Sequence, residues 1–450
     1  MNLMRKSVCA MLGCALTLPV WAQSLSGAVE YTIKTNPDVL ATAKERMAVE
    51  QEVKEARSGY LPSLDVTAGY GYEEANNPST RARHLADPTR SISPGMERTE
   101  LSVQLRQMVF DGFATPSEVR RQKNRVNSRA ASVFAASEKV ALDAAEAYLD
   151  VLREQELVEL AKENLEIHEK TMDQIKLRSQ MGVGRRADES QADGRVALAR
   201  RNLISEEGNL VDAESHYKRI IGEAPNDLKM PEQIDSSLPG NLDDAIGMAV
   251  GNHPVLKSAE ADIEAAKAQR ETAKSPFYPR VDIELQSAQY SNLNGVPGYN
   301  NDYQAMVRMR YNLFKGGKDY ARLKETGHLL EQSQEVRNKT YRQVEESMRF
   351  SWNALETVTR QMDFLKLHVD STEKTHVAYR QQFSLGERTL LDMLDTANEL
   401  YTAKTAYANA VYDHQFATYR VLASMAALNH TLQVKLPEEA IRMDVDQPLF

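Results

Sequence analysis

The chain has 450 residues with 55 basic and 64 acidic side chains, which give a formal net charge of −9. This acidic balance argues against nucleic acid as a partner, because proteins that bind nucleic acid carry a basic surplus. The two cysteines are Cys9 and Cys14, so the residues after them offer no disulfide, no thiol nucleophile and no thiolate metal site.

The first 22 residues have the pattern of a secretory signal peptide. Arg5 and Lys6 precede an apolar run of about 14 residues, and Val20-Trp21-Ala22 leaves small residues where a signal peptidase reads them, so we expect cleavage after Ala22. Lipid attachment at Cys14 is disfavoured, because only seven residues separate it from Lys6 and apolar sequence continues beyond it. No later run of about 18 apolar residues predicts a transmembrane helix.

Residues 23–222 are predicted to form a helix, two strands, a very long helix and a shorter return helix. Apolar residues alternate with polar or small residues at about 64–73 and 99–110. This period of two is typical of strands with one apolar and one polar face. Between the two strands, the segment 75–96 contains Asn77-Pro78 and Ser93-Pro94-Gly95 and is predicted to be an exposed outer loop.

The segment 116–180 is predicted to be one continuous helix, because after Pro116 it contains neither glycine nor proline. At 1.5 Å per residue such a helix extends roughly 98 Å, which is too long for a globular domain. A return helix at about 188–221 and a linker at 223–241 follow. Valines recur at intervals of seven, which predicts apolar stripes that face neighbouring helices: Val119, Val126, Val133 and Val140.

The second half of the chain repeats the order of the first. Asn36-Pro37 recurs as His253-Pro254 at an offset of 217 residues, and Gly184 recurs as Gly386 at an offset of 202. Ordered proline and glycine landmarks of this kind indicate a duplication. The second repeat is predicted at 242–429, with strands at about 280–290 and 302–314, a long helix at about 319–383, a return helix at about 389–428, and then a C-terminal tail at 430–450.

Four alternating strands in an exported chain favour the wall of a membrane barrel, with lipid outside and water inside, over an ordinary half-buried sheet. Four strands cannot close such a barrel, and an open sheet edge in hydrocarbon leaves backbone groups unsatisfied at several kcal/mol each. The chain must therefore oligomerise if it spans a membrane. Two copies would supply eight strands and three would supply twelve. For the helices alone, a plain antiparallel coiled-coil rod that acts as a scaffold or adaptor is the alternative.

Six motifs lie at landmarks of the two repeats: NPDV at 36–39, SGYLPSLDV at 58–66, QMVFDG at 107–112, EAYLDVLR at 146–153, GVGRRADESQADGR at 182–195 and SLGERTLLDMLD at 384–395. With these motifs, the chain resembles the TolC family of trimeric outer-membrane channel-tunnels. The resemblance implies a mainly α fold with a β-barrel portion: a homotrimer with a twelve-stranded β-barrel in outer-membrane lipid and a long α-barrel of coiled helices in the periplasm. The first-half motifs look most like the branch that serves type I secretion, including export of adhesins.

The same resemblance implies the exit duct of a tripartite export system, located in the cell outer membrane with a large periplasmic portion. The partners implied are a periplasmic adaptor and an inner-membrane ABC transporter or proton-driven pump, because this chain carries no nucleotide motif of its own. Type I secretion of a large protein such as an adhesin is the function we expect. An efflux duct for drugs or metals is the alternative, and a structural periplasmic coiled coil is an alternative of another class.

The stretch SLGERTLLDMLD places Asp392 and Asp395 on one face of a helix, about a turn apart. A solvated helix face is the ordinary interpretation of such a pair. The resemblance implies instead that these acids ring the closed pore and favour cations, and that Arg388 and Asp188 form a latch. Where relatives commonly have a tyrosine, this chain has Phe383, which has no hydroxyl with which to bond Asp188.

Contact with the adaptor is expected at the turns of the two helical hairpins, and no catalytic, metal or cofactor site is expected, so the chain is not predicted to be an enzyme. The sequence contains no HExxH or GxSxG motif, and KGGK at 315–318 lacks the Walker spacing. Gly316 and Gly317 are better explained as the break between strand and helix. The expected adaptor contacts are Gly182, Gly184, Arg185, Arg186, Ser384, Gly386 and Glu387.

Overall fold

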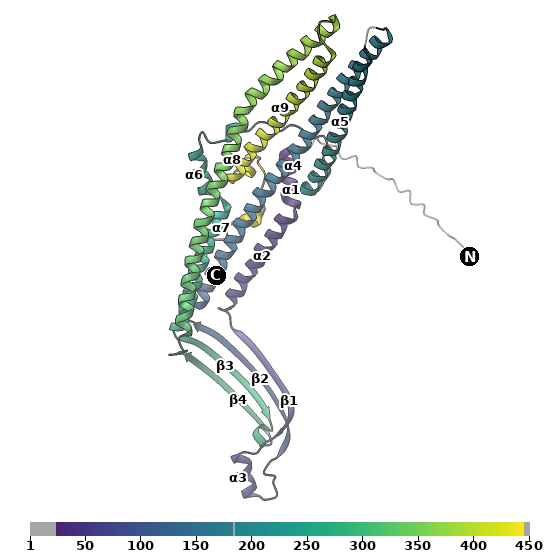
Figure 1. Cartoon of the computed structure of the whole chain (residues 1–450). Coiled ribbons are helices and arrows are strands. Elements are labelled where there is room, and N and C mark those ends of the chain that lie inside the picture. The colour runs from purple at the N-terminus through teal and green to yellow at the C-terminus, as the bar shows by residue number, and fades with distance from the viewer. Residues whose placement is uncertain (1–23, 183–184, 445–450) are drawn as a thin grey trace, which may run out of the picture. The chain divides into compact units, whose positions relative to one another are not determined.

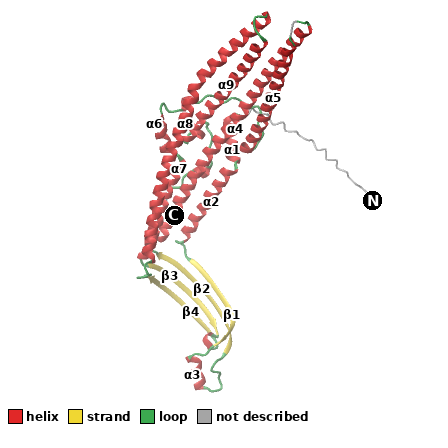
Figure 2. Ribbon diagram, in the orientation of Figure 1, coloured by secondary structure: helices red, strands yellow, loops and turns green. Residues whose placement is uncertain are grey.

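A computed structural model of the chain describes residues 24–182 and 185–444, and it is mainly helical with one four-stranded sheet (Figures 1 and 2). The predicted signal peptide and Gly184 lie outside the described residues. Among the residues that are described, none of the helices is both long enough and apolar enough to cross a membrane.

The elements follow the order predicted for two repeats, each with paired strands and two long helices. The helices are α1 (Leu25–Thr35), α2 (Pro37–Ser58), α3 (Pro78–Ala86), α4 (Ala114–Gln180), α5 (Arg186–Ile221), α6 (Leu242–Asn252), α7 (Pro254–Lys274), α8 (Lys318–Leu385), α9 (Leu390–Ser424) and α10 (Leu428–Thr431). The strands are β1 (Ser63–Glu74), β2 (Gly95–Phe110), β3 (Arg280–Ser291) and β4 (Tyr299–Arg310).

The chain divides into two compact units, and each unit draws on both predicted repeats. Unit 1 contains the described residues up to Thr32, together with Asp143–Gln233 and Arg360–Phe416. Unit 2 contains Ile33–Leu142, Ile234–Thr359 and the described residues from Ala417 onward. The helical hairpin turns therefore belong to unit 1 and the whole sheet belongs to unit 2.

The four strands form one antiparallel sheet in the order β1-β2-β3-β4. One row across the sheet pairs Leu64 with Leu105, Leu105 with Leu285, and Leu285 with Ala305. The neighbouring row joins four polar residues in the same way: Asp65, Gln104, Gln286 and Gln304. Because side chains alternate between faces along every strand, this register collects the apolar residues on one face and the polar residues on the other.

Local capping explains where several helices begin. The Asn36 side chain accepts a hydrogen bond from the backbone N–H of Asp38, and Pro37 occupies the first turn of α2. His253 and Pro254 play the same two parts at the start of α7. The proline landmarks of the two repeats thus mark equivalent helix starts.

The outer loop contains a helix that was not predicted. Asn77 and Thr80 form a capping box, in which the Asn77 side chain accepts from the Thr80 N–H and the Thr80 hydroxyl accepts from the Asn77 N–H, both at 3.0 Å. This box starts α3, a short helix within the segment 75–96 that was predicted to be an exposed outer loop. The Asn77 amide also donates to the carbonyl of Asn294 at 2.9 Å, which ties α3 to the loop between β3 and β4.

The last strand is shorter than predicted. β4 ends at Arg310, which pairs with the first residue of β3, Arg280. Residues 311–314 continue the alternating pattern but find no β3 residue opposite them, so the prediction of strand to 314 is wrong. Gly316 and Gly317 follow with φ of 64° and 82°, the left-handed backbone that lets the chain turn into α8.

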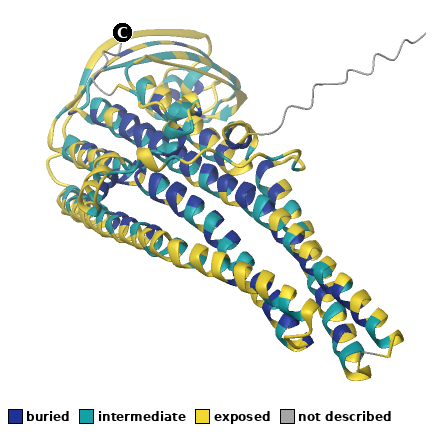
Figure 3. Cartoon of the chain, turned by 90° about the horizontal axis from the view of Figure 1, so that it is seen from above, coloured by how far each residue is buried: buried dark blue, intermediate teal, exposed yellow. Residues whose placement is uncertain are grey.

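The two longest helices differ in how far the chain buries their apolar residues. In α4, Val126 and Val133 are fully buried together with many alanines. In α8, Val336, Phe350 and Phe364 are more than half exposed. Figure 3 shows helices with buried residues along only part of their surface. The apolar side of α8 that carries Val336, Phe350 and Phe364 is therefore uncovered within one chain, whereas Val344, Met348 and Leu355 of the same helix are buried.

Candidate functional site

On β3, the sheet buries two acids of its polar face and exposes residues of its apolar face. On β3, Asp282 is 0% and Glu284 8% exposed, whereas Leu285 beside them is 45% exposed. On β4, Val307 is 71% exposed. A sheet that faces water on one side places its apolar residues against the protein. This sheet has the opposite polarity, which matches a wall with lipid on the apolar side and a polar interior.

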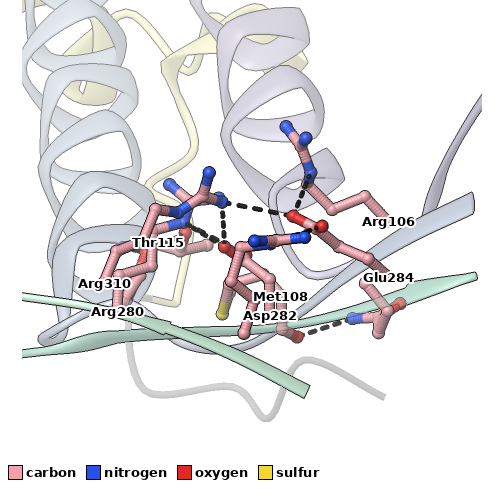
Figure 4. Close-up of polar contacts among 10 residues, drawn as sticks. Arg106, Met108, Thr115, Arg280, Asp282, Glu284 and Arg310 are labelled. Carbon is pink, nitrogen blue, oxygen red and sulfur yellow. Dashed lines mark hydrogen bonds and ion pairs between the residues drawn. The ribbon is translucent and has the colours of Figure 1, made fainter. Parts of the chain in front are cut away.

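Two acids and four arginines form one network on the polar face, shown in Figure 4. Asp282 accepts from Arg280 Nε at 3.1 Å and from Arg310 Nη2 at 2.6 Å. Glu284, two residues further along β3, forms ion pairs with the other arginines and with Arg310: Arg308 at 2.7 Å, Arg106 at 3.4 Å and Arg310 at 3.6 Å. The acids are thus buried with their charges paired, as buried carboxylates require.

The alternating pattern predicted a charged face, but it could not predict this network. Arg106, Asp282 and Arg310 come from three different strands, and only the register of the sheet brings them together. A shift by one residue would move each side chain to the other face.

The motif QMVFDG forms the junction between β2 and α4. Asp111 Oδ2 accepts from the backbone N–H of Thr115 at 2.8 Å and from its hydroxyl at 2.6 Å, which caps the start of α4. Gly112 has a φ of 70°, and a Cβ atom there would lie only 2.5 Å from the carbonyl oxygen of Ser275. Glycine is needed because the chain approaches the end of α7 closely at this point.

The first hairpin turn, between α4 and α5, presents two arginines and an acid. Gly182 has a φ of 76° and follows the end of α4, and α5 begins at Arg186 after Arg185. Asp188 lies in the first turn of α5, where a negative charge is favourable. Within the part of the chain that the structure describes, the Asp188 carboxylate forms no bond with Arg388 or with Phe383. A latch between Asp188 and Arg388 stays a prediction.

In the second hairpin turn, between α8 and α9, Arg388 packs against the last turns of α8. Gly386, with a φ of 81°, terminates α8. The Arg388 guanidinium lies 4.1 Å from the centre of the Tyr379 ring, and its Nε donates to the Gln382 side chain at 3.0 Å. Its Nη1 is 3.9 Å from Asp392 Oδ2, beyond hydrogen-bond distance.

The two acids of SLGERTLLDMLD have different partners. Asp392 Oδ2 accepts from the Thr389 hydroxyl at 2.8 Å, and the Asp392 N–H donates to the same hydroxyl oxygen at 3.2 Å. This reciprocal bonding starts α9. Asp395 instead accepts from Arg195 Nη2 at 2.5 Å, a bond that joins α9 to α5. Of these two acids, Asp395 is therefore the one that connects the two hairpins.

Arg195 is a candidate gate residue that was missed from the sequence. It lies within the quoted motif GVGRRADESQADGR, but 200 residues separate it from Asp395, and no spacing pattern connects them. Its importance depends on α5 lying beside α9, which is a tertiary feature.

Phe383 has no hydroxyl group for a hydrogen bond, and its ring contributes packing instead. Its ring packs against an apolar cluster contributed by α4, α5 and α9, and the guanidinium of Arg178 lies over it, 5.2 Å from the ring centre. Contacts between a cation and an aromatic face of this kind are favourable. The buried members of the cluster are Met172, Ile175, Ala192, Leu390, Met393 and Leu394.

Further along the hairpins, unit 1 buries two histidines between helices. His168 of α4 and His376 of α8 are almost fully buried. Burial lowers the pKa of His168 to about 4, and the charges of Arg195 and His376 add to this shift. Burial likewise lowers the pKa of His376. Outside this buried region, Lys404 of α9 forms an ion pair with Glu163 of α4 at 2.8 Å.

Residues 24–182 and 185–444 contain no group of three or more His, Cys, Asp or Glu side chains arranged to hold a metal ion.

Comparison with known proteins identifies the family. The sequence profile described as "Outer membrane efflux protein" matches residues 29–223 and 245–427. The chain is 22% identical to outer membrane protein TolC of Escherichia coli, covering 91% of this chain and 83% of TolC. It is also 22% identical to the alkaline protease secretion protein AprF of Pseudomonas aeruginosa, covering 93% and 88% of the two chains.

Solved structures agree on the fold. The outer membrane channel CmeC of Campylobacter jejuni superimposes with a TM-score of 0.77 at 14% identity, covering 93% of this chain and 90% of CmeC. With matched segments in both halves and a shared fold of long helices and a four-stranded sheet, the chain belongs to the outer membrane efflux protein family.

Proposed function

We propose that the protein is the outer-membrane exit duct of a tripartite export system, a passive trimeric channel-tunnel that an adaptor and a pump open. Family membership locates the chain in the outer membrane, and the relatives named above are efflux and secretion proteins. The observation that carries the proposal is the polarity of the sheet, in which Asp282 and Glu284 are buried and Leu285 and Val307 are exposed. Lipid against that apolar face accounts for the exposure.

The free edges of the sheet call for an oligomer, and a trimer would remove them. β1 and β4 stand at the two ends of the strand order, and in hydrocarbon each unpaired edge would leave backbone groups unsatisfied. Pairing β4 of one chain with β1 of the next removes all edges once the ring closes. Three chains give twelve strands, the count that the family resemblance implies. The uncovered apolar side of α8 supplies a matching contact surface between the helices of neighbouring chains.

We further propose that the entrance is closed by the second hairpins. Arg388 would act as latch, and Asp392 and Asp395 from three chains would form an acidic ring that favours cations. Arg195 would hold Asp395 while the entrance is closed. The adaptor would contact the turns at Gly182, Arg185 and Arg186 in the first hairpin, and at Ser384, Gly386 and Glu387 in the second; Gly184, outside the described residues, belongs to the same predicted set.

Type I secretion of a large protein such as an adhesin is the cargo we favour, with an ABC transporter as the pump. The support is the resemblance of the first-half motifs and the printed function of AprF, which is named for protease secretion. Efflux of drugs or metals, with a proton-driven pump, is the second candidate, and the family name favours it. If the protein serves type I secretion, deleting its gene should remove a large protein from the medium. If it serves efflux, the deletion should raise drug sensitivity and leave secretion unchanged.

The trimer and the channel can be tested together on protein extracted from the outer membrane. Light scattering in detergent should give the mass of three chains, and the same sample should form ion-conducting pores in a planar bilayer. A water-soluble monomer in the periplasm would contradict the proposal and favour the coiled-coil scaffold.

A further inference from the structure

We propose that four arginines at the base of the sheet, the end where β2 leads into α4, bind acidic side chains of an exported protein on its way through the channel. The inference rests on the proposed function, because it takes the polar face of the sheet as the wall of a water-filled interior. It names an acidic polypeptide as the cargo. Figure 4 shows three of the four arginines, which are Arg106, Arg280, Arg308 and Arg310.

The two acids of the network position these arginines without using up their donors. Asp282 accepts from Arg280 Nε at 3.1 Å, and Glu284 accepts from Arg308 Nε at 2.7 Å. A guanidinium has five N–H donors in a rigid fork. Within the described residues, the Nη groups of Arg280 make no hydrogen bond, and Arg106 Nε, 3.4 Å from Glu284, makes none either. These donors are left for a further acceptor.

The arginines are also accessible to a ligand. Their side chains are between 40% and 53% exposed, whereas Asp282 and Glu284 are buried. A cavity of about 590 Å³, lined by Arg280 and Arg310, lies where β3 begins and provides room beside them. A carboxylate suits these donors, because its two oxygens can accept two parallel N–H bonds from one guanidinium.

The register of the sheet gives the two ends of its polar face opposite charges. At the base, the four arginines face three acids, of which only Asp65 is exposed. Toward the outer loops, Arg98 is the single basic residue among three acids, which are Glu73, Glu100 and Asp302. An acidic segment is therefore attracted at the base, and the outer half of the face favours its release.

The arrangement suits a ligand with several carboxylates better than a single small anion. An ion pair with a half-exposed arginine is weak, so one carboxylate or one phosphate ion gains little. In a closed trimer, three such clusters would surround one channel, and a chain with several acids could engage more than one arginine at once. Contacts that are weak and multiple also let a passing chain leave, as conduction requires.

Arg280→Gln is the test variant, because Asp282 keeps its 2.6 Å bond to Arg310 when Arg280 is lost. Arg98→Gln is the matched control. It removes the same charge from the same face, but in the outer half, where Arg98 bonds Glu73 and Glu100. The purified oligomer is placed in a planar bilayer, and the current is measured while a short oligoglutamate peptide is added on the side of the outer loops. A neutral Gly-Ser peptide of the same length and inorganic phosphate are titrated in parallel.

We expect oligoglutamate to block the wild type and Arg98→Gln at similar concentrations. Arg280→Gln should need an about fivefold higher concentration, the factor that corresponds to an exposed ion pair of about 1 kcal/mol. The neutral peptide should block none of them. If Arg280→Gln does not assemble, Arg308→Gln replaces it, since Glu284 keeps Arg106 and Arg310 as ion-pair partners.

Three results overturn the proposal. The first is equal block of Arg280→Gln and the wild type, or no block of the wild type. The second is equal weakening in Arg280→Gln and Arg98→Gln, which indicates the general charge of the channel instead of a site. The third is block by inorganic phosphate at the concentration of the peptide, which indicates a site for a free oxyanion.

Binding of a fluorescent oligoglutamate peptide to the same oligomer in detergent separates this inference from the proposed function. An oligomer that forms pores but neither binds the peptide nor is blocked by it refutes the arginine site alone. A protein that binds the peptide through Arg280 but forms neither trimer nor pore refutes the proposed channel alone.

Discussion

Asp282 in the sheet and Asp395 in the second hairpin are both paired with arginine, but their surroundings are opposite. Asp282 is completely buried and is shared by Arg280 and Arg310. The side chain of Asp395 is 54% exposed and has one arginine partner, Arg195. The two pairs have similar short contacts, of 2.6 and 2.5 Å, so distance alone does not separate their roles.

Burial decides what each pair can do. Removing one partner from a buried pair costs about 3–5 kcal/mol, because it leaves an uncompensated charge away from water. An exposed pair is worth about 0.2–1 kcal/mol. A contact of the first kind fixes the register of the sheet, whereas one of the second kind can open and close. We therefore expect Asp282 to stay paired in the sheet, and the pair formed by Asp395 to be able to open if the proposed entrance moves.

The largest effect is expected for Asp282→Ala. The substitution removes two charge-assisted hydrogen bonds, from Arg280 and from Arg310, each worth about 1.5–3 kcal/mol. Because both arginines stay about half exposed to water, we expect a loss near the low end of their sum, about 3 kcal/mol in stability. The measurement is the temperature at which the purified oligomer dissociates in detergent, with Asp65→Ala, an exposed acid on β1, as control. If the two variants dissociate at the same temperature, Asp282 does not have the role assigned to it.

A buried acid that accepts hydrogen bonds from backbone N–H groups sharpens the comparison. Glu138 of α4 accepts from the N–H groups of Leu428 and Asn429 at 3.2 and 3.3 Å. Burial raises its pKa from 4.5 to about 7, although these hydrogen bonds oppose the shift. Folding therefore favours the protonated form, so stability should fall as pH rises from about 4.5 to 7, by roughly 3 kcal/mol in all.

The measurement for Glu138 is the pH dependence of the same dissociation temperature. Glu138→Gln, which keeps the shape and removes the titration, should flatten the profile over this range. The hypothesis is rejected if the profile of the variant has the slope of the wild type.

At the hairpin, Asp392→Ala with Asp395→Ala should change selectivity more than stability. We expect at most about 1 kcal/mol of destabilisation per exposed acid, and a reduced preference for cations in a planar bilayer, because the charge at the entrance is lost. Asp363→Ala with Asp370→Ala, two acids of α8 outside the turn, provides a control of equal charge. Unchanged selectivity in the first double variant would refute the acidic ring.

The smallest effect on stability is expected for Arg388→Ser. Arg388 is exposed and held by Tyr379 and Gln382, so the fold should tolerate its loss. If Arg388 latches the entrance, the variant should conduct more or admit bulky antibiotics. Arg380→Ser, on α8 before the turn, serves as control. A closed channel with wild-type conductance would count against the latch.

The sequence predicted most of the elements because their signals are local. Alternation located the four strands, and the absence of glycine and proline located α4 to within two residues at its start. The end of β4 was misplaced because strand length depends on a pairing partner, and α3 was missed although Asn77 and Thr80 carry a capping box. Arg195 could not be found, because its partner Asp395 lies on another hairpin.

We expect the polar face of the sheet to line a water-filled channel and the apolar face to meet lipid. Neighbouring residues of β3 test it directly: Gln286→Cys and Leu285→Cys are compared in outer-membrane vesicles with a water-soluble maleimide. Cys9 and Cys14 lie in the predicted signal peptide, so we expect little background labelling. We expect rapid labelling of the cysteine at position 286 and protection of the cysteine at position 285. Equal labelling, or labelling at 285 alone, would contradict it.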